Sequence, residues 1–296
     1  MHNNNYIEFK KERDLGAIIS DTFKFLRLEW KPFFGTILRT AFLPIIIAIA
    51  GLFFYMYSFP NIFEGLGVTS SLDDGIYEVP NFGLMFTSIA FMGIFFLIAY
   101  VIMNITALYY IQSYIENKGN IDFTMIQDRV KDKFWSFTGL FILAGLIVGF
   151  SFVLCFFPII YTSVVLALAA PILVYSKLDV ADTISYSFKF VNGHWWETFG
   201  VMIVVSIITT VIGYIFSVPA VAYFFIKMGT VISTNDPTGM TEALKDPIYL
   251  ALNGISYIAQ FILYAVTLIT NVFLYFDIAE QKYGTGTNEK IDNLGS

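Results

Sequence analysis

The chain has 296 residues, of which 57% are hydrophobic and 14% are charged, and its mean hydropathy is +0.69. Soluble globular domains carry about 25% charged residues, so this composition excludes an ordinary soluble domain and belongs to the membrane class. The net charge of −6 argues against a nucleic-acid-binding surface, and the single cysteine, Cys155, excludes an internal disulfide.

Five apolar runs are long enough to cross a membrane, and the longest of them holds two spans. About 20 helical residues at 1.5 Å each cover the ~30 Å hydrocarbon core. One run, 137–175, is 39 residues long and has Pro158 near its middle. Proline disfavours helical geometry in the residue before it and removes a backbone donor, so we divide this run into two spans. The predicted spans are 36–57, 84–110, 137–157, 159–175, 199–218 and 255–276.

Lysine and arginine are distributed very unevenly between the two sides of these spans. Fifteen of them lie before the first span, in alternate loops and after the last span, and only Lys227 and Lys245 lie on the other side. The 58–83 loop on that other side contains four acidic residues and no basic one. Because basic residues are enriched in cytoplasmic loops, we predict a multi-pass protein of the bacterial inner membrane with both termini in the cytoplasm.

A short stretch of sequence occurs twice, 165 residues apart. Residues 19–38 read ISDTFKFLRLEWKPFFGTIL and residues 184–203 read ISYSFKFVNGHWWETFGVMI, with eight of twenty positions identical. Any membrane helix attracts aromatic and basic flanking residues, so chance resemblance is the alternative. The ungapped match favours a true duplication.

Each copy is predicted to be an amphipathic helix that lies in the membrane plane directly before a span. Apolar residues recur at steps of four, three and four, which is the spacing of one helical face, and Lys24 or Lys189 lies opposite. Asp179 and Asp182 indicate a helix start before the second copy. The apolar residues are Ile19, Phe23, Leu26 and Trp30 in the first copy, and Ile184, Phe188, Val191 and Trp195 in the second.

A weaker third copy precedes the third span, with Trp135 just before Gly139. The sequence therefore predicts an all-α integral membrane protein with six transmembrane helices and in-plane amphipathic helices on the cytoplasmic side. The pseudo-repeats are 13–112, 121–176 and 178–280, followed by a short cytoplasmic tail at 281–296; whether the middle unit is a true repeat stays open. Its apolar residues are Phe123, Ile126, Val130 and Phe134. The predicted membrane-interface anchors are Trp30, Trp135, Trp195, Trp196, Lys24 and Lys189, because indole rings and basic groups favour the headgroup level.

Few polar residues are arranged for chemistry. His2 and His194 have no Cys or His partners at metal-ligand spacing, so we predict no metal, no cofactor and no catalytic residue. His194 is interpreted as an interfacial polar residue. The triplet 73–75, Asp-Asp-Gly, is interpreted as a turn because it lacks the alternation of a calcium loop.

Transport is the sharper alternative. Arg39 and Asp277 are the ionisable residues inside the predicted spans, and both lie near cytoplasmic ends where they can reach water. Asn104, Gln260 and Asn271 lie deeper and are interpreted as interhelical contacts rather than as a pathway.

The stretch Pro158-Ile-Ile-Tyr161, an apolar segment with Pro171, and then Gly193-His194-Trp195 together resemble a known family. It is the bacterial multi-pass membrane domain that is also found joined to glycerophosphodiester phosphodiesterases. The opening segment 7–16 and the closing segment 280–286 resemble a Bacteroidota branch of this group. The phosphodiesterase catalytic domain is absent from this chain, so the resemblance implies no catalytic residue here. It does imply an assembly, because relatives of this branch lie beside genes for other membrane proteins and an AAA+ ATPase.

These observations lead to one expectation and two alternatives. We expect a non-enzymatic scaffold or subunit of a larger complex, with membrane lipids and other inner-membrane proteins as partners and no nucleic acid. The first alternative is a transporter or channel for a small solute or lipid. The second is an intramembrane enzyme acting on lipid.

Overall fold

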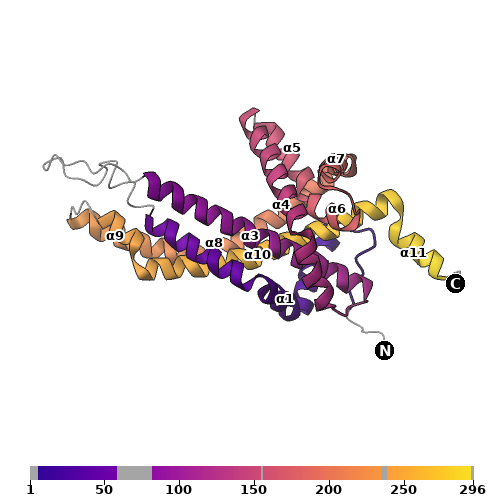
Figure 1. Ribbon diagram of the computed structural model, residues 1–296, viewed down its shortest axis with the longest axis horizontal. Helices are drawn as coiled ribbons and strands as arrows, with labels where there is room; N and C mark the ends of the chain where they lie inside the picture. Colours follow the sequence, from indigo (N-terminus) through magenta and orange to yellow (C-terminus); the bar gives the residue numbers. More distant parts are fainter. Residues whose placement is uncertain (1–5, 59–81, 155, 235–238, 295–296) are drawn as a thin grey trace. The chain divides into compact units, whose positions relative to one another are not determined.

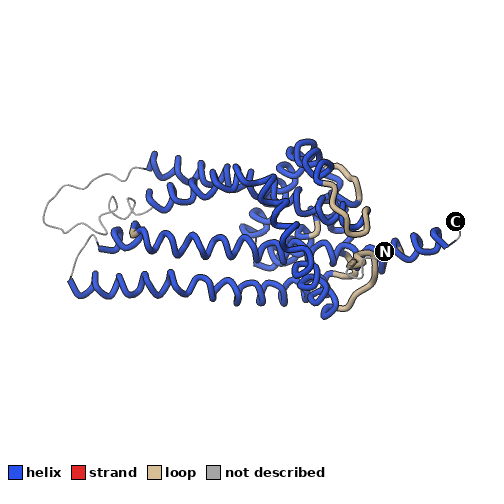
Figure 2. Tube along the Cα trace, turned by 90° about the horizontal axis from the view of Figure 1, so that it is seen from below, coloured by secondary structure: helices blue, strands red, loops and turns tan. Residues whose placement is uncertain are grey.

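The computed structural model describes residues 6–58, 82–154, 156–234 and 239–294. All regular structure in these ranges is helical, as Figures 1 and 2 show. The predicted all-α fold class is confirmed. His2, Cys155 and the acidic triplet 73–75 lie outside the described residues. The helices are α1 (Leu15–Ser58), α3 (Phe82–Glu116), α4 (Phe123–Leu154), α5 (Phe156–Ala167), α6 (Ala169–Tyr175), α7 (Val180–Val191), α8 (Trp195–Thr234), α9 (Gly239–Lys245), α10 (Pro247–Tyr283) and α11 (Thr285–Leu294).

Six of the helical segments are long and apolar enough to span a membrane, so the protein is a multi-pass integral membrane protein. The predicted division near Pro158 is confirmed, because α4 ends at Leu154 and α5 begins at Phe156. The helices overshoot the predicted spans: α1 alone has 44 residues. At 1.5 Å per residue this is about 66 Å, roughly twice the hydrocarbon thickness, because the helix continues through polar residues that a hydropathy window leaves out.

The amphipathic segments differ in how they join their spans. The second copy forms a separate helix, α7, which ends before Gly193. Gly193 has a φ of +88°, a conformation that glycine adopts without the Cβ penalty, and the chain restarts as α8 at Trp195. The first copy and the middle segment are different, since they continue without interruption into α1 and α4. A separate helix before each span is therefore wrong for these two segments.

An aspartate stands at the start of each of the three units. Asp14 Oδ1 accepts a hydrogen bond from the Ala17 amide at 2.7 Å, and Asp122 Oδ1 accepts one from the Met125 amide at 3.0 Å. Asp179 occupies the N-cap position of α7, although its side chain makes no capping hydrogen bond. A carboxylate at this position satisfies amide groups that have no partner within the helix, and it interacts favourably with the helix dipole.

Two pairs of helices begin at the offset of the sequence match. Helix α1 begins at Leu15 and α7 at Val180, while α3 begins at Phe82 and α10 at Pro247. Both pairs of starting residues are 165 positions apart, which is the offset of the sequence match. These shared offsets agree with the predicted pseudo-repeat, and the duplication itself stays a prediction.

The two copies also bury equivalent side chains, and they differ in how far the predicted apolar face is buried: Ile184 and Val191 of the second copy are buried. In the first copy the predicted apolar face is only partly buried, and Trp30 is 53% exposed. The neighbouring row is buried instead, because lipid and protein both accept apolar side chains and the periodicity cannot separate them. The buried pairs, at the same offset, are Ile18 and Thr183, Thr22 and Ser187, and Phe25 and Phe190.

By contacts the chain divides into two compact units. Unit 1 comprises residues 1–41, 100–209 and 264–296, and unit 2 comprises residues 42–99 and 210–263. The centre of unit 1 is the second half of α10, which is buried almost without interruption from Ala265 to Glu280. The short helix α6 and the end of α3 are the other main buried segments of this unit.

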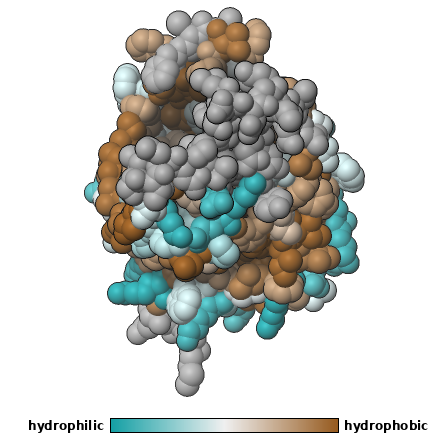
Figure 3. Space-filling model, turned by 90° about the vertical axis from the view of Figure 1, so that its left-hand side faces the viewer, coloured by the Kyte–Doolittle hydropathy of each residue, from teal (hydrophilic) through white to brown (hydrophobic). Residues whose placement is uncertain are grey.

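Unit 2 contains the remaining parts of α1, α3, α8 and α10, together with α9. Gly51 of α1 lies so close to α3 that a Cβ there would approach the Met92 Cα within 3.2 Å. Ser256 Oγ of α10 donates to the Phe216 carbonyl of α8 at 2.9 Å. Many apolar side chains in this unit are exposed, as expected for a lipid-facing surface, and Figure 3 shows apolar side chains at the surface of the face in view.

Candidate functional site

The segment before α1 is packed into unit 1 rather than free. The Ile7 amide donates to the Tyr114 hydroxyl at 3.0 Å. Phe9 is fully buried and stacks on Phe273, with ring centroids 4.2 Å apart. Tyr6 stacks on Tyr114, and burial raises the pKa of Tyr6 to about 12. These aromatic contacts fix the N-terminal segment against α3 and α10.

Arg13 is the most highly connected residue of this segment, and its side chain is fully buried. Its guanidinium donates to the carbonyls of Phe9 and Lys11, at 2.7 and 3.1 Å, and to that of Glu8. Arg13 Nε pairs with Asp21 Oδ2 at 2.9 Å. Burial lowers the pKa of Arg13, and the carboxylate of Asp21 opposes this by stabilising the charged form. The guanidinium thus organises the turn that leads into α1.

Asp277 of α10 also binds the N-terminal segment. Its Oδ1 accepts the Arg13 amide at 2.7 Å, and its Oδ2 accepts Gln281 Nε2 at 3.1 Å. Only 4% of Asp277 is exposed, so the expectation that it meets water at the end of its span is wrong. The carboxylate instead accepts a hydrogen bond from the Arg13 backbone amide, which takes the place of a hydrogen bond from water.

The C-terminal segment is joined to the same cluster. Glu280 accepts the amides of Gly286 and Thr287, at 2.5 and 3.0 Å, and so caps the start of α11. Two exposed ion pairs then connect the chain ends. We call residues 6–14 with 277–290 the terminal clasp. The ion pairs are Lys10 with Glu289, at 2.5 Å, and Lys290 with Glu8, at 2.7 Å.

Sequence reasoning missed Arg13 and Glu280 of the terminal clasp, and Asp21, which pairs with Arg13 from α1. Arg13 and Glu280 bond to backbone groups of the chain, and Asp21 bonds to the side chains of Arg13 and Lys11, which suits all three to holding the fold. The two segments of this contact, 7–16 and 280–286, are those that carry the stated resemblance, but nothing in the sequence indicated that they touch. Among the described residues no three His, Cys, Asp or Glu side chains are grouped to hold a metal ion.

The predicted interface anchors are found in two kinds of environment. Trp30, Trp135 and Trp196 project outward, with 53%, 78% and 77% of each residue exposed. Lys24 and Lys189 are exposed as well. Each is thus placed where a lipid headgroup could reach it, and the anchoring role itself stays a prediction.

Trp195 differs from the residue it aligns with. Its ring stacks on Phe199 and on Tyr161 of α5, with centroids 4.8 and 6.0 Å apart. Its indole N–H is buried and has no hydrogen-bond partner in the described part of the chain. Trp195 therefore packs between helices, whereas the aligned Trp30 is exposed.

His194 lies at the start of α8 with a single ionisable neighbour. Its Nδ1 is 3.2 Å from Glu197 Oε2, and the Glu197 side chain is largely exposed. The His194 carbonyl accepts the Thr198 amide and hydroxyl, at 3.0 and 2.9 Å. This arrangement is typical of a helix N-terminus. The His194 carbonyl accepts two hydrogen bonds there, whereas the imidazole contacts only Glu197.

The polar residues deep in the spans are used differently from one another. Asn104 Nδ2 donates to the Tyr100 carbonyl at 2.9 Å, and the Tyr264 hydroxyl lies 2.6 Å from the Tyr100 hydroxyl and 3.1 Å from Asn104 Oδ1. Asn271 Nδ2 donates to the Ala167 carbonyl at 3.3 Å. The contacts of these two asparagines agree with their interpretation as interhelical contacts. Gln260 is exposed, and no such contact is seen for it within the described ranges.

Comparisons of the chain with protein-family models, with curated proteins and with solved structures found no match.

Proposed function

We propose that this protein is a non-enzymatic scaffold or subunit of a larger complex in the bacterial inner membrane. The observation that supports it is the terminal clasp, in which the most convergent set of charged groups is committed to joining the two chain ends. A catalytic or transport centre needs polar atoms that are free to contact a substrate. The polar atoms of Arg13 and Glu280 instead form hydrogen bonds with backbone groups of the chain itself.

The location in the membrane is part of the same proposal. Both termini face the cytoplasm, since 15 of the 17 lysines and arginines lie on that side. The relationship to the phosphodiesterase-associated membrane domains also remains a proposal. It is supported by the segments 7–16 and 280–286, which carry the resemblance and meet in the terminal clasp.

The test is a tagged wild-type protein purified in mild detergent from its own host, after in-cell crosslinking, followed by quantitative mass spectrometry. We expect at least one membrane protein at near-stoichiometric amount, absent from a matched six-span control protein. His194→Gln should leave this recovery, the protein's abundance and the deletion phenotype unchanged. Loss of the phenotype at normal abundance, with partners retained, would reject the non-enzymatic proposal.

A transporter is the second candidate, and one observation favours it. Tyr100, Asn104 and Tyr264 form a polar group inside candidate spans, and such groups often line a substrate path. The Tyr264→Phe variant separates the two functions. A scaffold should retain its partners and lose only a modest amount of stability, whereas a transporter should lose solute-dependent growth or uptake at unchanged abundance.

A further inference from the structure

Four cationic side chains form a row along α1. Lys24, Arg27, Lys31 and Arg39 follow one another at steps of three, four and eight, so they share one face of the helix. All four are exposed. Within the described part of the chain, none of these four cations forms an ion pair with a carboxylate. We call these four residues the basic row.

The basic row contains a gap at Gly35, one turn from both Lys31 and Arg39. A Cβ at Gly35 would meet no other atom within 4 Å, so the helix backbone is open to the outside there. Aromatic rings lie near both cations, with the Lys31 ammonium 5.8 Å from the Trp30 ring and the Arg39 guanidinium 5.8 Å from the Phe123 ring. Two cations thus border an uncovered turn of helix.

The second copy of the repeat shows that this row is not a general feature of the fold. The lysine and the glycine are retained, but the other three cations are not. A Cβ at Gly200 would contact Leu15 at 3.7 Å, so the equivalent gap is covered. The aligned pairs are Lys24 and Lys189, Arg27 and Asn192, Lys31 and Trp196, Gly35 and Gly200, and Arg39 and Val204.

We propose that the basic row, with its gap at Gly35, binds the phosphate headgroups of anionic phospholipid. Opposite charge is one reason, since exposed cations next to a span attract anionic lipids. The position is another, because Trp30 is 53% exposed and indole rings favour the headgroup level. Arg39 adds geometry: its planar fork can hold a phosphate through two hydrogen bonds, and helical side chains generally lean toward the N-terminal end of the helix, which is the direction of the gap.

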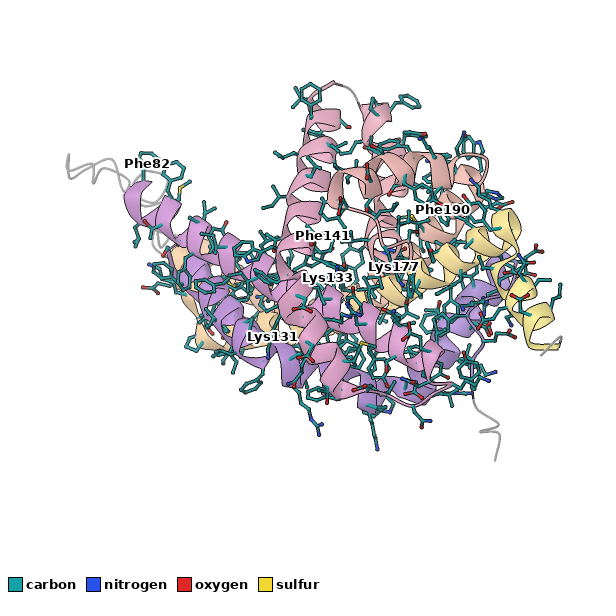
Figure 4. The ribbon with its side chains drawn as sticks, turned by 45° about the vertical axis from the view of Figure 1, so that its right-hand side comes forward. Phe82, Lys131, Lys133, Phe141, Lys177 and Phe190 are labelled. Carbon is teal, nitrogen blue, oxygen red and sulfur yellow. The ribbon has the colours of Figure 1, made fainter. Side chains whose placement is uncertain are left out.

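The test uses the full-length protein in detergent and native mass spectrometry with phosphatidylglycerol or phosphatidylcholine of the same acyl chains. We expect preferential binding of phosphatidylglycerol. The triple variant Arg27→Gln, Lys31→Gln, Arg39→Gln should weaken this binding by about tenfold or more, from the attraction of several cations to one anionic surface. The matched control removes the same charge elsewhere, at Lys118, Lys131 and Lys177, which are all exposed. Figure 4 labels Lys131 on α4 and Lys177 after α6.

A second variant keeps every charge. Gly35→Leu adds a side chain where a Cβ would meet no neighbouring side chain or helix within 4 Å, so it should fold and yet weaken phosphatidylglycerol binding. Equal losses in the two triple variants would mean that only net charge matters, and would overturn the proposal. Displacement of the lipid by millimolar inorganic phosphate would assign the row to a soluble anion. Loss of a co-purifying acidic protein with unchanged lipid binding would assign it to a protein. Either result would overturn the lipid site.

Discussion

Pro171 leaves one carbonyl of the buried α5–α6 segment without its helical partner. The Ala167 carbonyl would normally accept the amide of residue 171, but proline has no N–H. Asn271 Nδ2 supplies the missing donor at 3.3 Å. An unpaired carbonyl in this position would cost on the order of 1–3 kcal/mol, so the asparagine compensates for the proline.

This compensation predicts that the two residues are energetically coupled. Asn271→Leu should cost about 1 kcal/mol more in the natural background than in a Pro171→Ala background, where the restored amide can bond to the Ala167 carbonyl. A double-mutant cycle of thermal or detergent unfolding measures the difference. Equal costs in the two backgrounds would show that the asparagine does not replace the missing amide.

Arg13 should be more sensitive to a conservative change than its neighbour Lys11. Arg13→Lys keeps the charge but cannot reproduce a fork that reaches three carbonyls and Asp21, so we expect a loss of about 2–3 kcal/mol of stability. Hydrogen exchange of residues 6–14 should rise in parallel. Lys11→Gln is the matched control, because the Lys11 side chain is 46% exposed and its ion pair with Asp21 is 3.4 Å long. Comparable effects of both variants would contradict the assigned role of Arg13.

At the scale of the elements, Gly51 sets how closely α1 and α3 approach in unit 2. A larger side chain must push against the backbone of Met92, so Gly51→Leu should destabilise the protein by about 1–3 kcal/mol. Gly93 of α3 is the control, because a Cβ there would meet nothing within 4 Å. Gly93→Leu should be neutral or slightly stabilising, since leucine is the better helix former. Thermal unfolding of the two variants checks this, and a matching loss at Gly93 would be the contrary result.

The elements were largely predictable because the membrane imposes a length and proline and glycine mark the breaks. Pro158 predicted the turn between α4 and α5, and Asp179 predicted the start of α7. The face of the first amphipathic segment was not predictable from periodicity, because lipid and protein both accept apolar side chains. The terminal clasp was not predictable either: Arg13 and Asp277 lie 264 residues apart, and no local pattern joins them.

At the scale of the whole molecule, the constant offset of 165 residues links a short sequence match to two helical hairpins. The two copies differ most where they are exposed: the basic row is present on one copy only, while the equivalent positions Phe25 and Phe190 are both buried phenylalanines. Buried positions face the same packing constraint in both copies, whereas exposed positions are free to contact different lipids or proteins in each copy. If the predicted duplication is real, the differences between the two copies are the place to look for function.

The orientation of the chain is the remaining whole-molecule property, and it can be tested directly. Lys118 and Lys177 lie in loops on the two sides of the α4–α6 hairpin, so they must face the same side if that hairpin crosses the membrane twice. Glu242, in α9 between two other spans, must face the opposite side. From the excess of basic residues we expect positions 118 and 177 in the cytoplasm.

Single cysteines at these three positions, in a Cys155→Ser background, would be treated with an impermeant maleimide on spheroplasts before and after lysis. Only position 242 should be labelled before lysis. Labelling of 118 and 177 alone would invert the orientation and leave the spans intact, whereas labelling of just one of the two would contradict the six-span topology itself.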